Sequence, residues 1–483
     1  MKIKDSYGNS YEIDKKLSSG GQGIVYTLKN NRNIVLKYLV KPNTEEIVVD
    51  NNLYDEFEEK IMKIISLDIS NGIATPIVML ERPNCGYIMR LMDGMESLEK
   101  IMVNKPEPKT LESFIEFYEW YEKSGGLKRR LLIANKLAHV LNDIHSKGIL
   151  YADLSPKNVF ISKNINDNEV WLIDSDNLRY ENDFLGEPIL SPCYFPPELL
   201  NDEMDVVHHN TIKGDCYSFA LLIYELLTSC KPFEGNAVLF PEKEDWELED
   251  DELGINDQVD RGLVPWINDT NDSSNEGNGI FGFNIFNDNI KQAFIETFEN
   301  GKLNPTKRTS MKRWCDILDD ALRNLKICDG NKIIIDGENN FYHKSHYYLG
   351  DECHICRAKS KRVLSLIEAF DVFVLESDNE TVEQIESVGT QLIFRNEDAI
   401  EIDNKLLGRR SDIPKKFKII AEKDEKSKEI ISYKIITENI PNFEVIEKNK
   451  KVTDGIETLD AIQIVIAEDK FYKRVIKINY VKE

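Results

Sequence analysis

The stretch Asp153-Leu-Ser-Pro-Lys-Asn158, followed by Leu172-Ile-Asp174, decides how this sequence is interpreted. It places a carboxylate, an amide five residues later, and a second carboxylate sixteen residues beyond the amide. One acid can accept the proton of an attacking hydroxyl group, while the amide and the second acid can hold a metal ion against phosphates. Because such residues are common in loops, an interpretation as phosphoryl-transfer chemistry depends on finding further elements in the correct order.

Two upstream segments carry residue types suited to phosphates. Residues 17–26 contain three glycines and predict a tight turn between two strands, and glycine lets the backbone approach phosphates and direct N–H groups toward them. Ile34-Val-Leu-Lys37 predicts a short apolar strand that ends in a lysine, a point charge suited to the α- and β-phosphates. Apolar residues then recur with a helical period over residues 55–66. Glu58 on this predicted helix is the expected partner of Lys37.

In this order and spacing, the segment from about residue 11 to residue 325 resembles a eukaryotic-type protein kinase domain. Pro196-Pro-Glu198 resembles the end of the activation segment, and the apolar run that starts at Asp215 resembles the long buried helix of the C-lobe. Arg308 resembles the arginine that pairs with the glutamate of that Pro-Pro-Glu. We predict that Glu198 and Arg308 form a buried pair, which would be costly to break from one side only.

The resemblance implies an α+β, bilobal fold, with an N-lobe over about residues 1–92 and a C-lobe over about residues 93–326. It also implies an activity, the transfer of the γ-phosphoryl group of ATP to Ser or Thr of a protein substrate. Asp153 would be the catalytic base, and Lys37 would hold the phosphates with Glu58 behind it. The residues that would bind ATP and its Mg²⁺ (or Mn²⁺) are Gly20, Gly21, Gly23 and Val25 over the nucleotide, Met89 at adenine, and Asn158 and Asp174 on the metal.

The sequence departs from the family pattern at Ser18, which replaces the first glycine of the loop, and at three places around the catalytic residues. Tyr151-Ala-Asp153 stands where His-Arg-Asp is usual, so that the arginine is missing and we expect no activation by phosphorylation of the activation segment. Ser155 replaces a lysine that many Ser/Thr kinases place near the γ-phosphate, and Lys157 is predicted to compensate from two positions on. Asp174-Ser-Asp176 replaces Asp-Phe-Gly, so the aromatic residue of that motif is absent.

Two other functional classes stay open for this sequence. A pseudokinase scaffold is suggested by the departures, although the retained Lys37, Asp153, Asn158 and Asp174 argue against it. A small-molecule kinase of the aminoglycoside type has a similar catalytic loop and Ile-Asp segment. The complete activation segment and Arg308 favour a protein substrate over that second class.

A cysteine pattern follows the kinase-like segment, and it resembles the pattern of a bacterial group of stand-alone Ser/Thr kinases. Cys353-His-Ile-Cys356 offers two thiolates to one tetrahedral ion, and Cys328 with one histidine would complete a Cys₃His set for structural Zn²⁺. His343, His346 and His354 are all in reach, and the resemblance favours His346. The alternatives are inert buried cysteines or a redox pair, although the region lacks the βαβ setting of a thioredoxin.

Composition limits the compartment and the partners. The chain has 483 residues and a net charge of −24, which is far too acidic for nucleic-acid binding by bulk electrostatics. The sequence contains no apolar run long enough for a membrane helix, and its N-terminus lacks the apolar core of a signal peptide. The eight cysteines are scattered apart from one Cys-x-x-Cys. We therefore expect a cytoplasmic protein that binds neither nucleic acid nor membrane.

Two further regions are predicted outside the kinase-like site. Residues 241–260 are strongly acidic and predict a solvated insertion, or alternatively a docking surface for a basic substrate with Trp246 as anchor. Short alternating segments after residue 361 predict a β-rich sandwich or barrel module that binds a partner or mediates dimerisation. The expected domains are residues 1–326 (kinase-like), 327–360 (zinc knuckle) and 361–483 (β-rich module).

Overall fold

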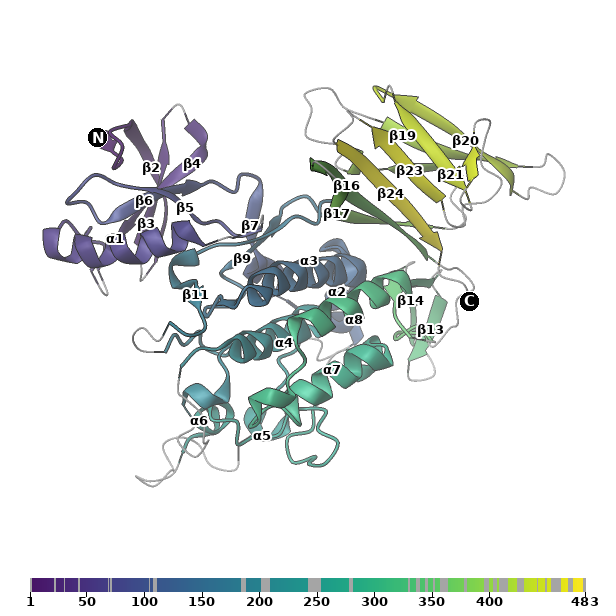
Figure 1. Cartoon of the computed structure of the whole chain (residues 1–483). Helices are drawn as coiled ribbons and strands as arrows, with labels where there is room; N and C mark the ends of the chain where they lie inside the picture. The colour runs from purple at the N-terminus through teal and green to yellow at the C-terminus, as the bar shows by residue number, and fades with distance from the viewer. Residues whose placement is uncertain are drawn as a thin grey trace. The chain divides into compact units, whose positions relative to one another are not determined.

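The computed structural model (Figure 1) divides into two compact units, Met1–Leu318 and Asp319–Glu483, and each unit is described by itself. None of the helices in the described parts of the chain combines the length and the apolar character that a membrane span requires. Two predictions, Gly21 and residues 242–252 of the acidic insertion, fall outside the described residues. The structure describes residues 2–480 except 21–22, 30, 42–43, 68, 70–71, 104, 107–110, 184–187, 201–208, 242–252, 278–280, 329–330, 336–338, 344–345, 351, 357–363, 378–379, 395–398, 403–405, 408–415, 424–429, 441, 448–449, 453–461 and 468–471.

A six-stranded sheet forms the N-terminal part of the first unit, and all of its neighbouring strands are antiparallel. Its order is β1 (Lys2–Lys4), β2 (Ser10–Gly20), β3 (Gly23–Leu28), β4 (Asn31–Leu39), β6 (Gly86–Arg90) and β5 (Pro76–Met79). Leu36, Tyr38 and Ile88 belong to an apolar core on one face of the sheet. Because successive side chains alternate across a strand, Lys37 and Met89 lie on the opposite face.

Helix α1 (Asn51–Ser66) covers the predicted helical segment and begins four residues earlier than predicted. Asp50 explains this start, because its side chain accepts hydrogen bonds from the backbone N–H groups of the first turn and so caps the helix. Ile61 and Ile64 are buried at the spacing of one helical face.

Helices dominate the rest of the first unit, and short strands lie between them along the chain (Figure 1). The helices are α2 (Leu111–Lys123), α3 (Gly126–Ser146), α4 (Ile212–Thr228), α5 (Asn236–Leu239), α6 (Ile255–Asp260), α7 (Asp288–Phe298) and α8 (Met311–Arg323), whose last residues belong to the second unit. The strands are β7 (Met95–Ser97), β8 (Ile149–Leu150), β9 (Val159–Ser162), β10 (Val170–Leu172) and β11 (Arg179–Tyr180).

An aromatic core fixes α4 in the centre of this helical part. The Tyr224 ring of α4 lies 5.1–6.1 Å, between ring centroids, from the rings of Trp266, Phe294 and Phe298. Edge-on aromatic contacts of this kind add to the gain from burying apolar area. The first turn of α4 carries Asp215, so the core indirectly positions that carboxylate.

The predicted pair of Glu198 and Arg308 is confirmed. The guanidinium donates two hydrogen bonds of 2.6 Å to the two carboxylate oxygens, and both side chains are almost completely buried. Arg308 Nε also donates to the Gly301 carbonyl at 2.8 Å. This bidentate geometry joins the end of the activation segment to the segment before α8.

Replacing Arg308 with alanine is expected to lower the free energy of unfolding of the first unit by about 3–5 kcal/mol, because Glu198 would stay buried without its guanidinium partner. Denaturant titration followed by tryptophan fluorescence measures this loss, since all five tryptophans lie in the first unit. Arg313→Ala is the matched control. Its pair with Glu296 has an arginine that is half exposed, so we expect a loss of less than about 1 kcal/mol. Equal losses in the two variants would contradict the role of the buried pair.

In the second unit, two short antiparallel strand pairs precede a β-rich module, and this module confirms the β-rich prediction. Strand β12 (Lys326–Cys328) pairs with β15 (His346–Tyr348), and β13 (Asn331–Ile335) pairs with β14 (Asn339–His343). The module's larger sheet has the order β17 (Glu380–Phe394), β16 (Leu364–Ser377), β24 (Tyr472–Tyr480), β23 (Ile462–Ala467), β21 (Phe443–Glu447) and β22 (Lys450–Val452). Its second sheet has the order β18 (Ala399–Ile402), β19 (Lys416–Lys423) and β20 (Ile430–Glu438).

One apolar core joins the two sheets of the β-rich module. Ile367 and Ile476 from the larger sheet share a buried cluster with Phe417 and Ile419 from the smaller sheet. Alternate residues of each strand therefore point between the sheets, as in a sandwich.

Candidate active site

The catalytic loop lies between β8 and β9, and α4 fixes its backbone. Asp215, almost fully buried, accepts hydrogen bonds from the backbone N–H groups of Tyr151 (2.7 Å) and Ala152 (2.9 Å). Ala152 has a φ of +70°, a conformation that non-glycine residues adopt rarely and that needs such support. The loop therefore enters the site in one defined backbone conformation.

Asp153, Asn158 and Asp174 converge at this loop. The Asn158 side-chain amide donates to the backbone carbonyl of Asp153 at 2.9 Å, and the N–H of Ile173 donates to the Asn158 carbonyl at 2.9 Å. The second bond places Asp174 next to Asn158. The carboxylate of Asp153 accepts a hydrogen bond from the Ser191 hydroxyl, so an alcohol can reach this carboxylate.

Lys37 projects from the sheet to two carboxylates. Its ammonium group donates to Asp174 and, at 2.6 Å, to Asp176. Burial would lower the pKa of Lys37, but the neighbouring Tyr87, Asp176 and Asp174 raise that pKa well above its ordinary value. Lys37 is therefore a cation, and only 7% of the residue's accessible surface is exposed to solvent.

The donor types at the predicted magnesium site suit that ion. Asn158 uses its amide N–H on the Asp153 carbonyl, which leaves its amide oxygen available as an acceptor. The Asp174 side chain is one-quarter exposed, and carboxylate and amide oxygens are the ligands that Mg²⁺ prefers. Burial raises the pKa of Asp174 above its ordinary value, Lys37 opposes this rise, and the like charge of Asp176 adds to it. A divalent cation would relieve this excess of negative charge.

Three of the predicted nucleotide-binding residues, Gly20, Gly23 and Val25, lie in β2 and β3 of the N-terminal sheet. Gly20 pairs with Gly23 where β2 turns into β3. A Cβ atom on Gly23 would lie 2.6 Å from the Tyr38 carbonyl oxygen, so a larger residue would not fit there. Val25 lies opposite Lys37 in the strand register.

The predicted adenine contact lies on the face of the sheet that carries Lys37. Met89 pairs with Val35, two residues from Lys37, and is buried. The structure thus brings Val25, Lys37 and Met89 to one surface that lies on the side away from the apolar core of the sheet.

The structure corrects the predicted partner of Lys37. Glu58 lies 3.6 Å from the guanidinium of Arg82, and the described residues show no contact between Glu58 and Lys37. The reason is helical rotation, because consecutive residues point about 100° apart. Phe57, one residue earlier, faces the site and stacks on Tyr87 with ring centroids 6.3 Å apart.

Lys157 also lies elsewhere than predicted. Its side chain is 75% exposed, and its ammonium group is 3.9 Å from Glu99. It occupies the middle of the turn before β9, where the side chain points to solvent. Ser155, which stands at the position of the family's lysine, is buried. Within the described residues, the structure therefore gives no contact between Lys157 and Asp153.

Two residues that the sequence did not single out organise the site. Asp176 contacts Lys37, as described above. Asn210, which is buried, exchanges hydrogen bonds with both backbone groups of Ile189 in the activation segment (2.9 and 3.0 Å). Its amide also contacts the Ala152 carbonyl (3.4 Å) and the Arg179 guanidinium (3.3 Å). An uncharged side chain thus ties the activation segment to the catalytic loop.

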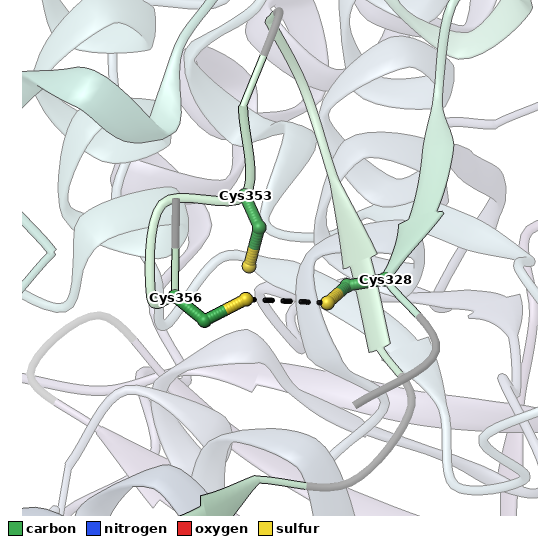
Figure 2. A group of neighbouring side chains, drawn as sticks. All are labelled: Cys328, Cys353 and Cys356. Atoms are coloured by element: carbon green, nitrogen blue, oxygen red, sulfur yellow. Dashed lines mark hydrogen bonds between the residues drawn. The ribbon is translucent and has the colours of Figure 1, made fainter. Parts of the chain in front are cut away.

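Three predicted zinc ligands form a cluster in the second unit (Figure 2). The sulfur atoms of Cys328, Cys353 and Cys356 all lie within 4.8 Å of one another, and those of Cys328 and Cys356 are 3.6 Å apart. His346 Nε2 lies 3.3 Å from the Cys353 sulfur. The His354 ring lies 5.4 Å from the His346 ring, between centroids. His343 lies in β14, and its side chain is outside the described set.

The fold of the first unit and the convergence of Lys37, Asp153, Asn158 and Asp174 point to the class of bilobal kinase-like domains. A family model described as "Protein kinase domain" matches residues 11–274, more than half of the chain. The chain therefore belongs to the protein kinase domain family.

Relatives with curated descriptions each match about half of the chain. A probable serine/threonine-protein kinase of Clostridium perfringens is 26% identical over 244 residues, which cover 48% of this chain and 30% of that protein. A serine/threonine-protein kinase of Myxococcus xanthus is 24% identical over 227 residues, which cover 47% and 25%. Calcium-dependent protein kinase 5 of Plasmodium falciparum is 26% identical over 237 residues, which cover 48% and 36%. The matches thus span only about a quarter to a third of the length of these relatives.

Proposed function

We propose that this protein transfers the γ-phosphoryl group of Mg·ATP to Ser or Thr hydroxyl groups of a protein substrate. The convergence of Lys37, Asp153, Asn158 and Asp174 within a protein kinase domain carries this proposal. The names of the bacterial relatives support serine and threonine as acceptors. The retained site residues and the complete Glu198–Arg308 pair do not favour the scaffold and small-molecule alternatives.

Each residue has a role that its position supports. Lys37 contacts the phosphates of ATP as a buried cation, and Asn158 and Asp174 hold the metal ion. When bound, Mg²⁺ supplies neutralising charge for the phosphates and the leaving group. Asp153 accepts a hydrogen bond from the substrate hydroxyl, orients it toward the γ-phosphorus, and takes its proton as transfer proceeds. Asn210 joins the activation segment to the catalytic loop by hydrogen bonds, so that this connection needs no phosphate group on the segment.

Transfer of labelled phosphate tests this proposal. The purified chain, incubated with γ-labelled ATP, Mg²⁺ and a generic basic protein, is expected to place label on serine or threonine, which phosphoamino-acid analysis identifies. The Asp153→Asn chain is the control for contaminating kinases. ATP binding without any protein labelling would instead support the scaffold or the small-molecule alternative.

We also propose that Cys328, Cys353, Cys356 and His346 bind a structural Zn²⁺. In a tetrahedral site with Zn–S bonds of about 2.3 Å and a Zn–N bond of about 2.0–2.1 Å, sulfurs lie about 3.8 Å apart and sulfur lies about 3.6 Å from nitrogen. The distances of 3.6 Å between the Cys328 and Cys356 sulfurs and 3.3 Å between His346 Nε2 and the Cys353 sulfur support such a site. Burial raises the pKa of the Cys353 thiol to about 12, so a cation is needed to stabilise its thiolate.

Metal analysis of freshly reduced full-length chain is expected to find about one zinc per chain. Cys353→Ser should lose most of this zinc, because it removes one of three thiolates. Cys85→Ser is the matched control, since Cys85 is equally buried but lies in the first unit, and it should keep the zinc. Protein without zinc, or a Cys353–Cys356 disulfide found by mass spectrometry after alkylation, would contradict the zinc site and favour the redox alternative.

A further inference from the structure

Asp176 is a buried acid whose contacts the proposed reaction steps leave unused. One of its carboxylate oxygens accepts a hydrogen bond of 2.6 Å from Lys37, and the other accepts one from the Tyr87 hydroxyl. Tyr87 lies opposite Lys37 in the register of β4 and β6. The three side chains therefore form one connected polar group beneath the sheet.

The two carboxylates on Lys37 are not equivalent. The Asp174 side chain is 25% exposed, whereas the Asp176 side chain is 9% exposed. Asp174 is also the acid that the family pattern assigns to the metal ion. The Asp176 carboxylate has both oxygens engaged within the protein, because Tyr87 takes the one that Lys37 does not. Asp176 is therefore the acid that stays with the lysine when Asp174 serves a metal ion.

A buried ammonium group requires a permanent counterion, since an isolated charge in the interior is strongly unfavourable. Helix α1 does not supply one among the described contacts. Glu58 lies against Arg82, and the α1 side chain that faces Tyr87 is the Phe57 ring. The carboxylate that the sequence predicted on a helix is found instead two residues after Asp174.

We propose that Asp176 is the positioning residue for Lys37, holding its ammonium group where it contacts the phosphates of ATP, with the Tyr87 hydroxyl fixing the carboxylate. This inference rests on the proposed function, because it assumes that Lys37 binds ATP. The proposed role of Asp176 differs from that of a purely structural ion pair in one respect. Asp176 should affect ATP only through Lys37, whereas a structural residue would affect the protein with or without that lysine.

A double-mutant cycle on ATP affinity tests this dependence. Calorimetry measures the binding of ATP with Mg²⁺ to the full chain as wild type, Asp176→Asn, Lys37→Met and the double variant. Asp176→Asn is expected to lower the affinity for ATP about tenfold or more, which is the effect of losing one charge-assisted hydrogen bond. The double variant should bind ATP no more weakly than Lys37→Met alone. Asp183→Asn, the same change at an exposed position of the activation segment, is the control and should bind as wild type does.

Tyr87→Phe provides a second measurement if Asp176→Asn does not fold. This variant keeps the ring that stacks on Phe57 but removes the hydroxyl group that donates to Asp176. It should lower the affinity for ATP by a smaller factor than Asp176→Asn does, and only when Lys37 is present. Unchanged affinity in Asp176→Asn, or an equal loss with and without Lys37, would overturn the inference. Wild-type chain that binds no ATP would refute the proposed function itself, which is a separate result.

Discussion

Asparagine at position 174 is expected to reduce phosphoryl transfer by at least about a thousandfold, because metal-ion stabilisation of the transition state contributes several kcal/mol. The substitution keeps the size and planarity of the side chain but removes the charge. Asn158 would remain beside it, held by its bond to the Asp153 carbonyl. A neutral amide pair binds Mg²⁺ much more weakly than a pair that contains a carboxylate.

The Asp174→Asn chain should fold as well as wild type. Its side chain is partly exposed, and Lys37 keeps Asp176 as a counterion. Denaturant titration checks this expectation, and calorimetry with and without Mg²⁺ checks the cause. In wild type, Mg²⁺ should strengthen ATP binding, and in the variant most of this gain should be lost. Transfer within tenfold of wild type would show that Asp174 is not an essential metal ligand. Asp183→Asn again serves as the control for an acid-to-amide change in the same segment.

The sequence predicted those parts of the site whose residue types are fixed by the chemistry of the reaction. Phosphoryl transfer restricts which residue types can act, and short spacings then fix their neighbours. Asp153 and Asn158 share one turn, so their proximity follows from five residues of sequence. The alternation of strands likewise placed Lys37 and Met89 on one face of the sheet.

Asp176, Glu58 and Asn210 could not be interpreted in this way, because their roles depend on rotation and tertiary contact. A helical period locates the apolar face of α1 but resolves neighbouring residues only to about 100° of rotation, which is the difference between Phe57 and Glu58. Asn210 contacts Ile189 across 21 residues of chain, and no motif marks such a contact. A second acid at the position of a family glycine is the one signal that could have pointed to Asp176.

The cysteine cluster depends partly on local sequence spacing and partly on tertiary contact. Cys-x-x-Cys brings two thiols together through local geometry alone. Cys328 joins them because β12 pairs with β15, so that Cys328 lies opposite His346 in the strand register. His346 Nε2 also lies 3.3 Å from the Cys353 sulfur. The spacing of residues along the chain names three candidate histidines, and the strand register places one of them, His346, opposite Cys328.

Asparagine at position 153 is expected to lower the turnover number by about 10²–10⁴-fold, the usual contribution of a positioned general base. ATP affinity should change only a few-fold. The structure supports this separation, because Asn158 is held by the backbone carbonyl of Asp153 and not by its carboxylate. Asp215 likewise fixes the loop through the N–H groups of Tyr151 and Ala152, which the substitution leaves in place. The nucleotide and metal contacts therefore persist when the base is lost.

Steady-state transfer to a generic basic protein, measured beside calorimetric ATP binding, tests this separation of kcat from ATP affinity for Asp153. The Ser191 hydroxyl donates to the Asp153 carboxylate, so this carboxylate is within reach of a hydroxyl group. An amide at this position can still accept a hydrogen bond but is far too weak a base to take the proton. The substrate hydroxyl would then be oriented without being activated, so the loss should appear in kcat. Equal losses in kcat and in ATP affinity would instead assign Asp153 to nucleotide binding and leave the base unidentified.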